Sequence, residues 1–354
     1  MTTGTLARSV PVLQRRRRPV GLLSALLLLI GGTCTLLGAI GMPWLFDSEA
    51  WLYWSLTFDA FNNFLPLWAV LIALGLALAL LRRTSSRFFL AAASTVLVVA
   101  LVPIGIEVSR KPDPAVPGSG KAIRLLQFNA LNGNTDLDAA LVLALYSNAD
   151  LIMVQEPNDF RSLEPRLHAA YPYQTPCPRS CDAVIYSRQR PLAADYAMVP
   201  GMLDSDGHPV EDSSLGYASM SLTGPDGEPF TAVTTHISWP YPPLPAQHQR
   251  DTLLQRIAGV DRSRAVLTGD FNLTPWTHSM RAFDERIQPM QRVTRALFSF
   301  PANPRNTTFS APFPFLPIDQ IYAGSRWRLV RAERGPVSGS DHYPVIVDLV
   351  MPAG

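Results

Sequence analysis

Cysteine is scarce in this chain, with three residues in 354, and no second cysteine pair or Cys/His cluster accompanies them. Cys34 lies in an apolar run, whereas Cys177 and Cys181 stand four positions apart in an expected loop. This spacing does not match a structural zinc site built from two ligand pairs. On the sequence alone, a local disulfide between Cys177 and Cys181 and two unlinked thiols are both open.

A basic excess is missing from the larger, second part of the chain. Residues 121–354 carry 20 Lys and Arg against 23 Asp and Glu, a formal net charge of −3, whereas residues 1–120 carry a net charge of +5. A broad nucleic-acid-binding surface usually presents an excess of positive charge. The composition therefore speaks against such a surface, although it does not exclude a nuclease with a narrow groove.

Charge is also missing from three long apolar runs in the first 110 residues. Val20–Met42, Phe64–Leu81 and Phe88–Ile106 hold 23, 18 and 19 residues without one charged side chain. A helix that crosses a bilayer needs about 20 such residues. We therefore expect three transmembrane helices at about 20–42, 64–81 and 88–108. Cleavage after the first run, as in a signal peptide, would still leave two anchors.

The charges between these runs predict how the chain is oriented. Basic residues precede the first run, at Arg15–Arg18, and separate the second from the third, at Arg82–Arg87. The segment between the first two runs has only acidic charges. The positive-inside rule then places the N-terminus in the cytoplasm and everything after the third span outside. We expect a multi-pass protein of the bacterial inner (cytoplasmic) membrane, with its second domain periplasmic or extracellular.

Proline and glycine cluster where the apolar part ends. Pro112, Pro114, Pro117 and two glycines fall within eleven residues, a composition typical of an extended linker. The sequence thus predicts a membrane region over residues 1–111, a linker over 112–120 and a domain over 121–354.

The domain alternates strand-like and helix-like patterns. Helices are expected over 137–146, with Thr135 or Asp136 as the cap, and over 244–260. Hairpins mixed with crossover helices favour one α+β domain, with sheets packed on each other and helices outside. Strands are expected over 122–129, 151–155, 183–187, 217–222, 230–236, 265–270, 318–322, 327–332 and 345–350.

Several of these strands end in polar residues that an apolar core does not require. In Gly-Asp-Phe-Asn, Asp270 and Asn272 stand two residues apart after a buried strand, where a carboxylate can accept a proton from a water. Each strand end alone could be an ordinary turn or cap. If the ends converge, they form an oxygen-rich site suited to Mg²⁺ or Mn²⁺, with two imidazoles beside it. The other strand ends are Asn129, Glu156, His236, Asp319, Asp341 and His342.

The ordered motifs QFNALNGN, VQEP, TTHIS, GDFN, IDQI and SDHYPV resemble those of the endonuclease/exonuclease/phosphatase (DNase I-like) superfamily. The superfamily includes nucleases, inositol-polyphosphate phosphatases and neutral sphingomyelinases. The resemblance covers about residues 123–350. It implies a four-layer α/β/β/α sandwich whose motif-bearing loops meet at one edge of the two sheets.

The resemblance also implies a role for each motif residue. Glu156 would be the principal ligand of Mg²⁺ or Mn²⁺, with Asn129 and Asp341 close to the metal and the phosphate. Asp270 would activate or orient the attacking water. Asn272 would hold that water or a phosphate oxygen.

The histidines would act on the phosphate. His236 and His342 would bind its oxygens and stabilise the transition state, and Asp319 would orient His342. Asp182 stands where many members place an acid that partners the first histidine, with a plain turn aspartate as the alternative. Leu131 departs from the abasic endonucleases, many of which have an acid there, and this weakens that subtype.

Together these observations predict a membrane-anchored, divalent-metal-dependent phosphoesterase. Its partners would be the lipid bilayer and a phosphodiester or phosphomonoester, with a lipid or small extracytoplasmic substrate favoured. No obligate protein partner is evident. One alternative is an anchored non-specific nuclease, and the other is a non-catalytic sensor or binding domain on the same fold.

Overall fold

The computed structural model describes residues 17–82, 86–110, 112, 120–178, 181–302 and 311–352, with side chains from residue 20 onward. Parts of the predicted orientation signal, Arg15, Arg16 and Arg83, lie outside these residues. So does most of the predicted linker, of which Pro112 and Gly120 are described.

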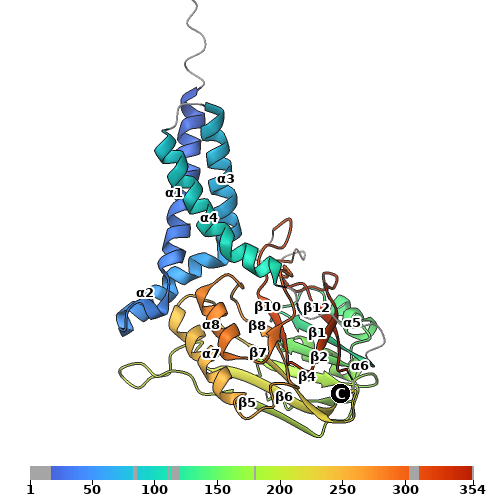
Figure 1. Ribbon diagram of the computed structural model, residues 1–354. Helices are drawn as coiled ribbons and strands as arrows, with labels where there is room; N and C mark the ends of the chain where they lie inside the picture. The colour runs from blue at the N-terminus through green and yellow to red at the C-terminus, as the bar shows by residue number, and fades with distance from the viewer. Residues whose placement is uncertain are drawn as a thin grey trace, which may run out of the picture.

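Three apolar helices form a bundle that stands away from the rest of the molecule (Figure 1). They are α1 (Arg17–Ile40), α3 (Leu65–Arg82) and α4 (Arg87–Ser109). The helical stretches Val20–Ile40, Glu49–Arg82 and Arg87–Ser109 are each long and apolar enough to cross a membrane. Three such helices were expected at these places, and the second stretch begins earlier than predicted.

That earlier beginning is a short helix at the base of the bundle. After η1 (Pro43–Leu45), helix α2 (Glu49–Asp59) begins at Ser48, whose hydroxyl accepts a hydrogen bond from the Trp51 amide at 3.1 Å. η2 (Ala60–Phe64) then leads into α3. Figure 1 shows α2 turned away from the bundle axis, and it contacts α7 and α8 of the second domain.

The second domain is built on two six-stranded sheets, each mixing parallel and antiparallel pairs. The order of the first sheet is β11 (Arg328–Arg334), β12 (Val345–Val350), β1 (Ala122–Asn129), β2 (Leu151–Gln155), β4 (Ala183–Ser187) and β3 (Tyr173–Gln174). The order of the second is β5 (Ala193–Val199), β6 (Leu215–Thr223), β7 (Pro229–His236), β8 (Val266–Asp270), β10 (Asp319–Ala323) and β9 (Gln291–Arg292).

The central strands are buried on both faces, and their alternating side chains fill two different layers. Along β1, Leu125 packs between the sheets, against Val266 and other residues of the second sheet. Its neighbours Leu126 and Phe128 point outward into a separate core. The same alternation in β8 sends Val266 inward and Leu267 outward.

Helices cover both outer faces. The first sheet is covered by α5 (Leu137–Tyr146), η3 (Phe160–Leu163) and α6 (Glu164–Leu167). The second is covered by α7 (Pro243–Arg256) and α8 (His278–Arg286). The result is a four-layer α/β/β/α sandwich, which confirms the predicted fold class.

Most predicted elements are present, and the missed ones have weak patterns. Asp136 caps α5 by accepting from the Ala139 amide at 2.9 Å. Helix α7 ends at Arg256, four residues before the predicted end. The prediction missed β5, a half-exposed strand, and α8, whose buried apolar residues are only Met280 and Phe283.

Candidate active site

Strand register brings the predicted site residues to one edge of the sandwich. β7 runs parallel to β8 with His236 opposite Asp270, and β10 runs antiparallel to β8 with Asp319 opposite Asp270. Side chains in one row across a sheet point to the same face. In the other sheet, Asn129 lies opposite the residue that precedes Glu156. Two parallel pairs, one in each sheet, therefore end at the same place.

Asn129 joins the two sheets at this edge. Its Nδ2 donates to Glu156 Oε1 at 3.1 Å and to Asp270 Oδ2 at 3.0 Å. The Asn132 amide donates to the other Glu156 oxygen at 3.1 Å. Ser340 donates its hydroxyl to the Asn129 carbonyl oxygen at 2.7 Å. Asn129, Glu156 and Asp270 are thus held in fixed relation.

Each site histidine is paired with its own carboxylate. His342 Nδ1 lies 2.8 Å from Asp319 Oδ2, and its Nε2 lies 3.4 Å from Asp270 Oδ2. His236 Nδ1 lies 3.2 Å from Asp182 Oδ1, and its Nε2 lies 3.8 Å from Asp270 Oδ2. The two outer carboxylates fix the ring orientations, and both rings present Nε2 to Asp270. Asp182 therefore partners the first histidine, as the resemblance implied.

These contacts set the protonation of the site. Burial lowers the pKa of each histidine, but the neighbouring carboxylates outweigh it, Asp319 for His342 and Asp182 for His236, and raise each pKa to about 10. Burial raises the pKa of Asp270 to about 6, although both histidines act against it. Burial also acts to raise the pKa of Asp319, but the imidazolium of His342 lowers it overall. At neutral pH the site therefore holds two cationic rings around an ionised Asp270.

Asp341 belongs to the same cluster. Burial raises the pKa of its carboxyl group, and the carboxylate of Glu156 raises it further, while His342 acts in the opposite direction. Asp341 and Glu156 are therefore close enough for their negative charges to interact. A cation between them would relieve that repulsion.

Two site residues have strained backbones. Glu156 has φ of 49° and Asn272 has φ of 50°, in the left-handed region that residues other than glycine adopt at an energetic cost. Asn272 donates its Nδ2 to the Ile237 carbonyl oxygen at 2.9 Å. Its Oδ1 is buried with no hydrogen-bond partner in the described part of the chain. Such an orphaned acceptor fits a site that receives a water or another donor.

A polar layer under the site was not found from the sequence. Gln127 Nε2 donates to Asp319 Oδ1 at 2.8 Å and to Gln155 Oε1 at 2.7 Å. Gln155 in turn donates to the Thr234 hydroxyl at 2.6 Å. The Thr268 hydroxyl donates to the same Thr234 oxygen at 3.0 Å. The sequence does contain a sign of this layer. Gln127, Thr234 and Thr268 each precede a site residue by two positions, and residues two apart in a strand point to the same face of the sheet.

The donor set fits a hard divalent cation. Asp270, Asp319 and His342 place one potential ligand atom each within 4.8 Å of one another. In that group, however, Asp319 is fully buried, and both of its oxygens accept hydrogen bonds, from Gln127 and from His342. Both oxygens of Glu156 also accept hydrogen bonds, but 21% of its side chain is exposed, so it is the more accessible carboxylate. Carboxylate and amide oxygens of this kind suit Mg²⁺ or Mn²⁺.

A cavity of about 620 Å³ opens beside His236 and Asp182. Its wall includes Trp239 and Tyr241, whose side chains are 59% and 64% exposed. The Trp239 ring packs edge-to-face on Phe300 at 6.1 Å, and Phe300 lies 4.8 Å from the His342 ring. The cavity therefore adjoins His236, and Phe300 lies between its wall and His342.

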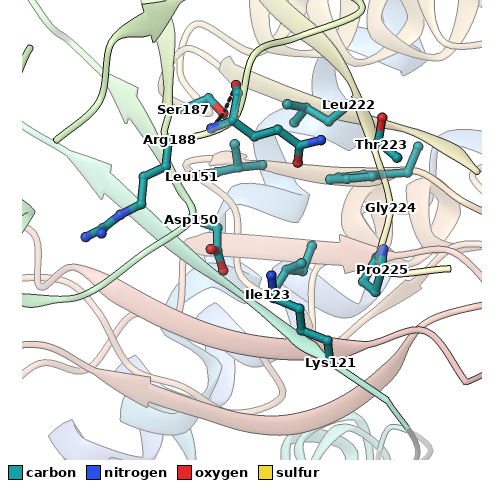
Figure 2. A pocket seen from close by; sticks show the side chains of 12 residues that line it. Lys121, Ile123, Asp150, Leu151, Ser187, Arg188, Leu222, Thr223, Gly224 and Pro225 are labelled. Carbon is teal, nitrogen blue, oxygen red and sulfur yellow. Dashed lines mark hydrogen bonds between the residues drawn. The ribbon is translucent and has the colours of Figure 1, made fainter. Parts of the chain in front are cut away.

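A second cavity, of about 310 Å³, lies at the opposite ends of the strands (Figure 2). Lys121, Asp150, Arg188 and the turn around Gly224 surround it. It contains none of the predicted site residues. The predicted site residues and this cavity are thus separated by the length of the sandwich.

An α/β/β/α sandwich with carboxylates, amides and two carboxylate-paired histidines at one edge defines a phosphoester hydrolase that uses a divalent metal. The family model for the endonuclease/exonuclease/phosphatase family matches residues 126–342. The chain belongs to this family. The predicted family and enzyme class are therefore confirmed.

Solved structures agree with this fold. One is an endonuclease/exonuclease/phosphatase family protein from Bacteroides thetaiotaomicron, with a TM-score of 0.53 at 15% identity, covering 66% of this chain and 99% of the other. A second, from Bacteroides vulgatus, has a TM-score of 0.53 at 19% identity, with 65% and 99% coverage. The mannosyl-6-phosphatase Bt3783 of Bacteroides thetaiotaomicron has a TM-score of 0.51 at 16% identity, with 64% and 99% coverage. No curated protein matches the chain in sequence.

Proposed function

We propose that the protein is a membrane-anchored phosphoesterase that hydrolyses a phosphodiester or phosphomonoester with a water activated at Asp270. The observation that carries the proposal is the position of Asp270. It is buried, it accepts from Asn129, and both histidines direct Nε2 toward it.

Glu156, Asn129 and Asp341 would hold Mg²⁺ or Mn²⁺. The bound cation would neutralise charge on the phosphate and so ease attack at phosphorus. The repulsion between Glu156 and Asp341 supports this assignment, as does the exposure of Glu156 at the site. Asn129 holds Glu156 by its amide nitrogen, and its amide oxygen would turn to the metal only by a flip of the side chain.

Asp270 and Asn272 would handle the water. The backbone N–H of Asn272 donates to Asp270 Oδ1 at 2.9 Å. The other oxygen of Asp270, Oδ2, faces the two histidines. A water in line with phosphorus could donate to Asp270 and to the unpaired Oδ1 of Asn272. Asp270 would accept its proton as a general base.

His236 and His342 would bind the phosphate oxygens by donating hydrogen bonds from Nε2. Both are cationic at neutral pH because their carboxylate partners raise their pKa values to about 10. Asp182 and Asp319 would keep the rings in place as negative charge builds up on the phosphate oxygens. Fixed cations of this kind stabilise charge that develops in the transition state.

A lipid substrate is favoured by the surroundings of the site. Tyr53, on α2, and Tyr241, in the wall of the larger cavity, lie close enough for their side chains to interact. Around α2, Trp44 and Trp54 expose 64% and 54% of their surface, as expected for rings at a membrane interface. Aromatic side chains thus run from the base of the bundle to the cavity.

The charge of that cavity weighs against nucleic acid. Its described lining includes the carboxylates of Asp182 and Asp212 and no Lys or Arg. A polyanion would find no cationic track there beyond His236. A lipid headgroup or a small phosphoester meets no such obstacle. The positive-inside pattern would place this cavity on the outer side of the membrane.

The test uses the full chain in nanodiscs with bis-p-nitrophenyl phosphate and Mg²⁺. Asp270→Ala and His342→Ala should each lower turnover by about 100-fold or more, because each removes a group that acts in the transition state. Asp348→Asn changes a buried carboxylate that pairs with Arg124 away from the site, and should retain turnover. If the parent protein shows no turnover, or if both alanine variants match it, the proposal is wrong.

A substrate screen separates the lipid preference from its alternatives. Phospholipid vesicles, a sugar phosphate and duplex DNA would be offered to the same preparation. Faster release of phosphate or headgroup from vesicles supports the lipid substrate. Preferential release of nucleotides from DNA would instead support the anchored nuclease.

A further inference from the structure

We infer that Asp59 and Asn63, which belong to the membrane region, are positioning residues for the loop that carries Asp270 and Asn272. The expected effect on catalysis rests on the proposed function. The structural support of the loop rests on the contacts of Asp59 and Asn63.

The loop needs support because of its conformation. Asn272 is in the left-handed region, and such strain persists only where the surroundings fix the backbone on both sides. On the N-terminal side, β8 fixes Asp270 through its pairing with β7 and β10. On the C-terminal side, the chain runs through Thr274 and Trp276 to the start of α8, with no strand to hold it.

Asn63 supplies the first contact on that side. Its Oδ1 accepts from the Thr274 amide at 2.9 Å, two residues after Asn272. Its carbonyl oxygen accepts from Trp276 Nε1 at 3.2 Å. Trp276 is buried, and it packs in one cluster with Leu65 and residues of α3 and α4. On this side the loop is therefore held by the membrane region as well as by its own domain, in whose core Leu273 is buried and where Phe298 packs on Trp276.

Asp59 supplies the second contact. One carboxylate oxygen accepts from the His278 amide at 2.7 Å and the other from the Ser279 amide at 2.8 Å. These two amides belong to the first two residues of α8. A negative charge is favoured there because of the free N–H groups and the helix dipole. Thr277 caps the same helix by accepting from the Met280 amide at 3.1 Å. The N-terminal cap of α8 therefore has two parts. Thr277 of the domain accepts from one amide, and Asp59 of the membrane region accepts from two more.

The two residues are locked in turn by the end of α1. Asn62 donates to Asp59 Oδ1 at 2.9 Å and to the Gly38 carbonyl oxygen at 3.0 Å. A side chain at Gly41 would collide with the backbone of Asp59. Asp59, Asn62 and Asn63 are each less than 5% exposed. The supporting groups therefore cannot shift without moving the helices.

A separate contact already ties the two parts together. Glu107, near the end of α4, forms ion pairs with Arg292 at 2.7 Å and with Arg295 at 2.8 Å. Within the described residues, none of these three forms a hydrogen bond or ion pair with the segment 270–279. Glu107 therefore serves as the matched control, because its loss loosens the junction without releasing the loop.

The experiment compares Asp59→Ala, Asn63→Ala, Asp59→Asn and Glu107→Gln in the full chain in nanodiscs. With bis-p-nitrophenyl phosphate and Mg²⁺, the alanine variants should lower kcat by about 10- to 100-fold with KM nearly unchanged, because misplacement of reacting groups by about 1 Å has this effect. Asp59→Asn keeps one acceptor oxygen and should retain most of the turnover. Glu107→Gln should lower the melting temperature yet retain kcat.

Hydrogen exchange provides a readout that needs no activity. In Asp59→Ala, amides of residues 274–280 should exchange at least about tenfold faster than in the parent, whereas Glu107→Gln should leave them protected. Unchanged exchange, or a fall in kcat that only follows the loss of thermal stability in all four variants, would overturn the inference. If the parent has no turnover but the exchange result holds, the proposed function fails and the support of the loop stands.

Discussion

Asp270 is the residue on which the contacts of the site converge. It accepts from Asn129 of the opposite sheet and from the backbone of Asn272, and it faces Nε2 of both histidines. Burial raises its pKa to about 6, so it remains an effective base near neutral pH. The two histidines are cationic at neutral pH only because Asp182 and Asp319 stand beside them. Burial alone would favour the neutral forms of both rings.

All the site residues selected from the sequence lie at this edge, because each lies at or within a few residues of the first or last residue of a strand and the register aligns those ends. The layer of Gln127, Gln155 and two threonines was missed. A buried glutamine in a strand is unusual, but only the packing of one sheet on the other shows what it bonds. The left-handed backbones of Glu156 and Asn272 were likewise not visible in the residue types.

Metal binding and water activation are expected to depend on different residues of the site. Glu156→Gln should weaken Mn²⁺ affinity by at least about 100-fold, since changes even to residues behind a ligand commonly cost 10- to 100-fold. Titration followed by electron paramagnetic resonance measures it. Glu164→Gln changes a glutamate that contacts Arg161 and Tyr186 outside the site, and should bind Mn²⁺ as the parent does. Equal affinities for Glu156→Gln and the parent would remove Glu156 from the metal site.

The elements at the junction do more than connect two parts. The acidic segment between the first two apolar runs is a helix, α2, that contacts α7 and α8. The sequence could not show this, because apolar content identifies the spans whereas the junction is made by buried polar groups such as Asp59 and Asn63. Helix α4 ends in the same way, with Glu107 buried among arginines of the second domain.

The ion pair at the end of α4 predicts a large effect on stability. Glu107→Ala leaves the buried guanidinium of Arg292 with Asp284 as its remaining partner, and should destabilise the protein by about 3 kcal/mol. Thermal unfolding in detergent measures the loss. Arg166→Ala removes an exposed pair with Asp138 and should cost less than about 1 kcal/mol. A loss for Glu107→Ala no greater than that for Arg166→Ala would show that the junction is not held there.

The whole molecule is a bundle of apolar helices fastened to a hydrolase (Figure 1). With three membrane spans, the positive-inside pattern would place the proposed active site outside the cytoplasm. Held at the base of the bundle, this site would then lie close to the bilayer surface. This geometry suits a substrate whose phosphate lies at the membrane surface.

The orientation has a direct test in fusion proteins. An alkaline phosphatase fused after residue 354 should be active and a green fluorescent protein at the same place dark, because the former folds only outside the cytoplasm and the latter only inside. Fusions after residue 86, between the second and third spans, should give the reverse pattern. An active phosphatase after residue 86 with a fluorescent C-terminal fusion would invert the topology and change the set of available substrates.

Removal and return of the metal tests whether hydrolysis depends on a divalent cation at Glu156. The full chain in nanodiscs would be treated with EDTA, its metal content measured, and its turnover of bis-p-nitrophenyl phosphate followed before and after addition of Mg²⁺ or Mn²⁺. Turnover should fall by about 100-fold or more without metal and return when either ion is added, because a cation at Glu156 would neutralise charge on the phosphate. Turnover that persists in metal-free protein would contradict this dependence on metal.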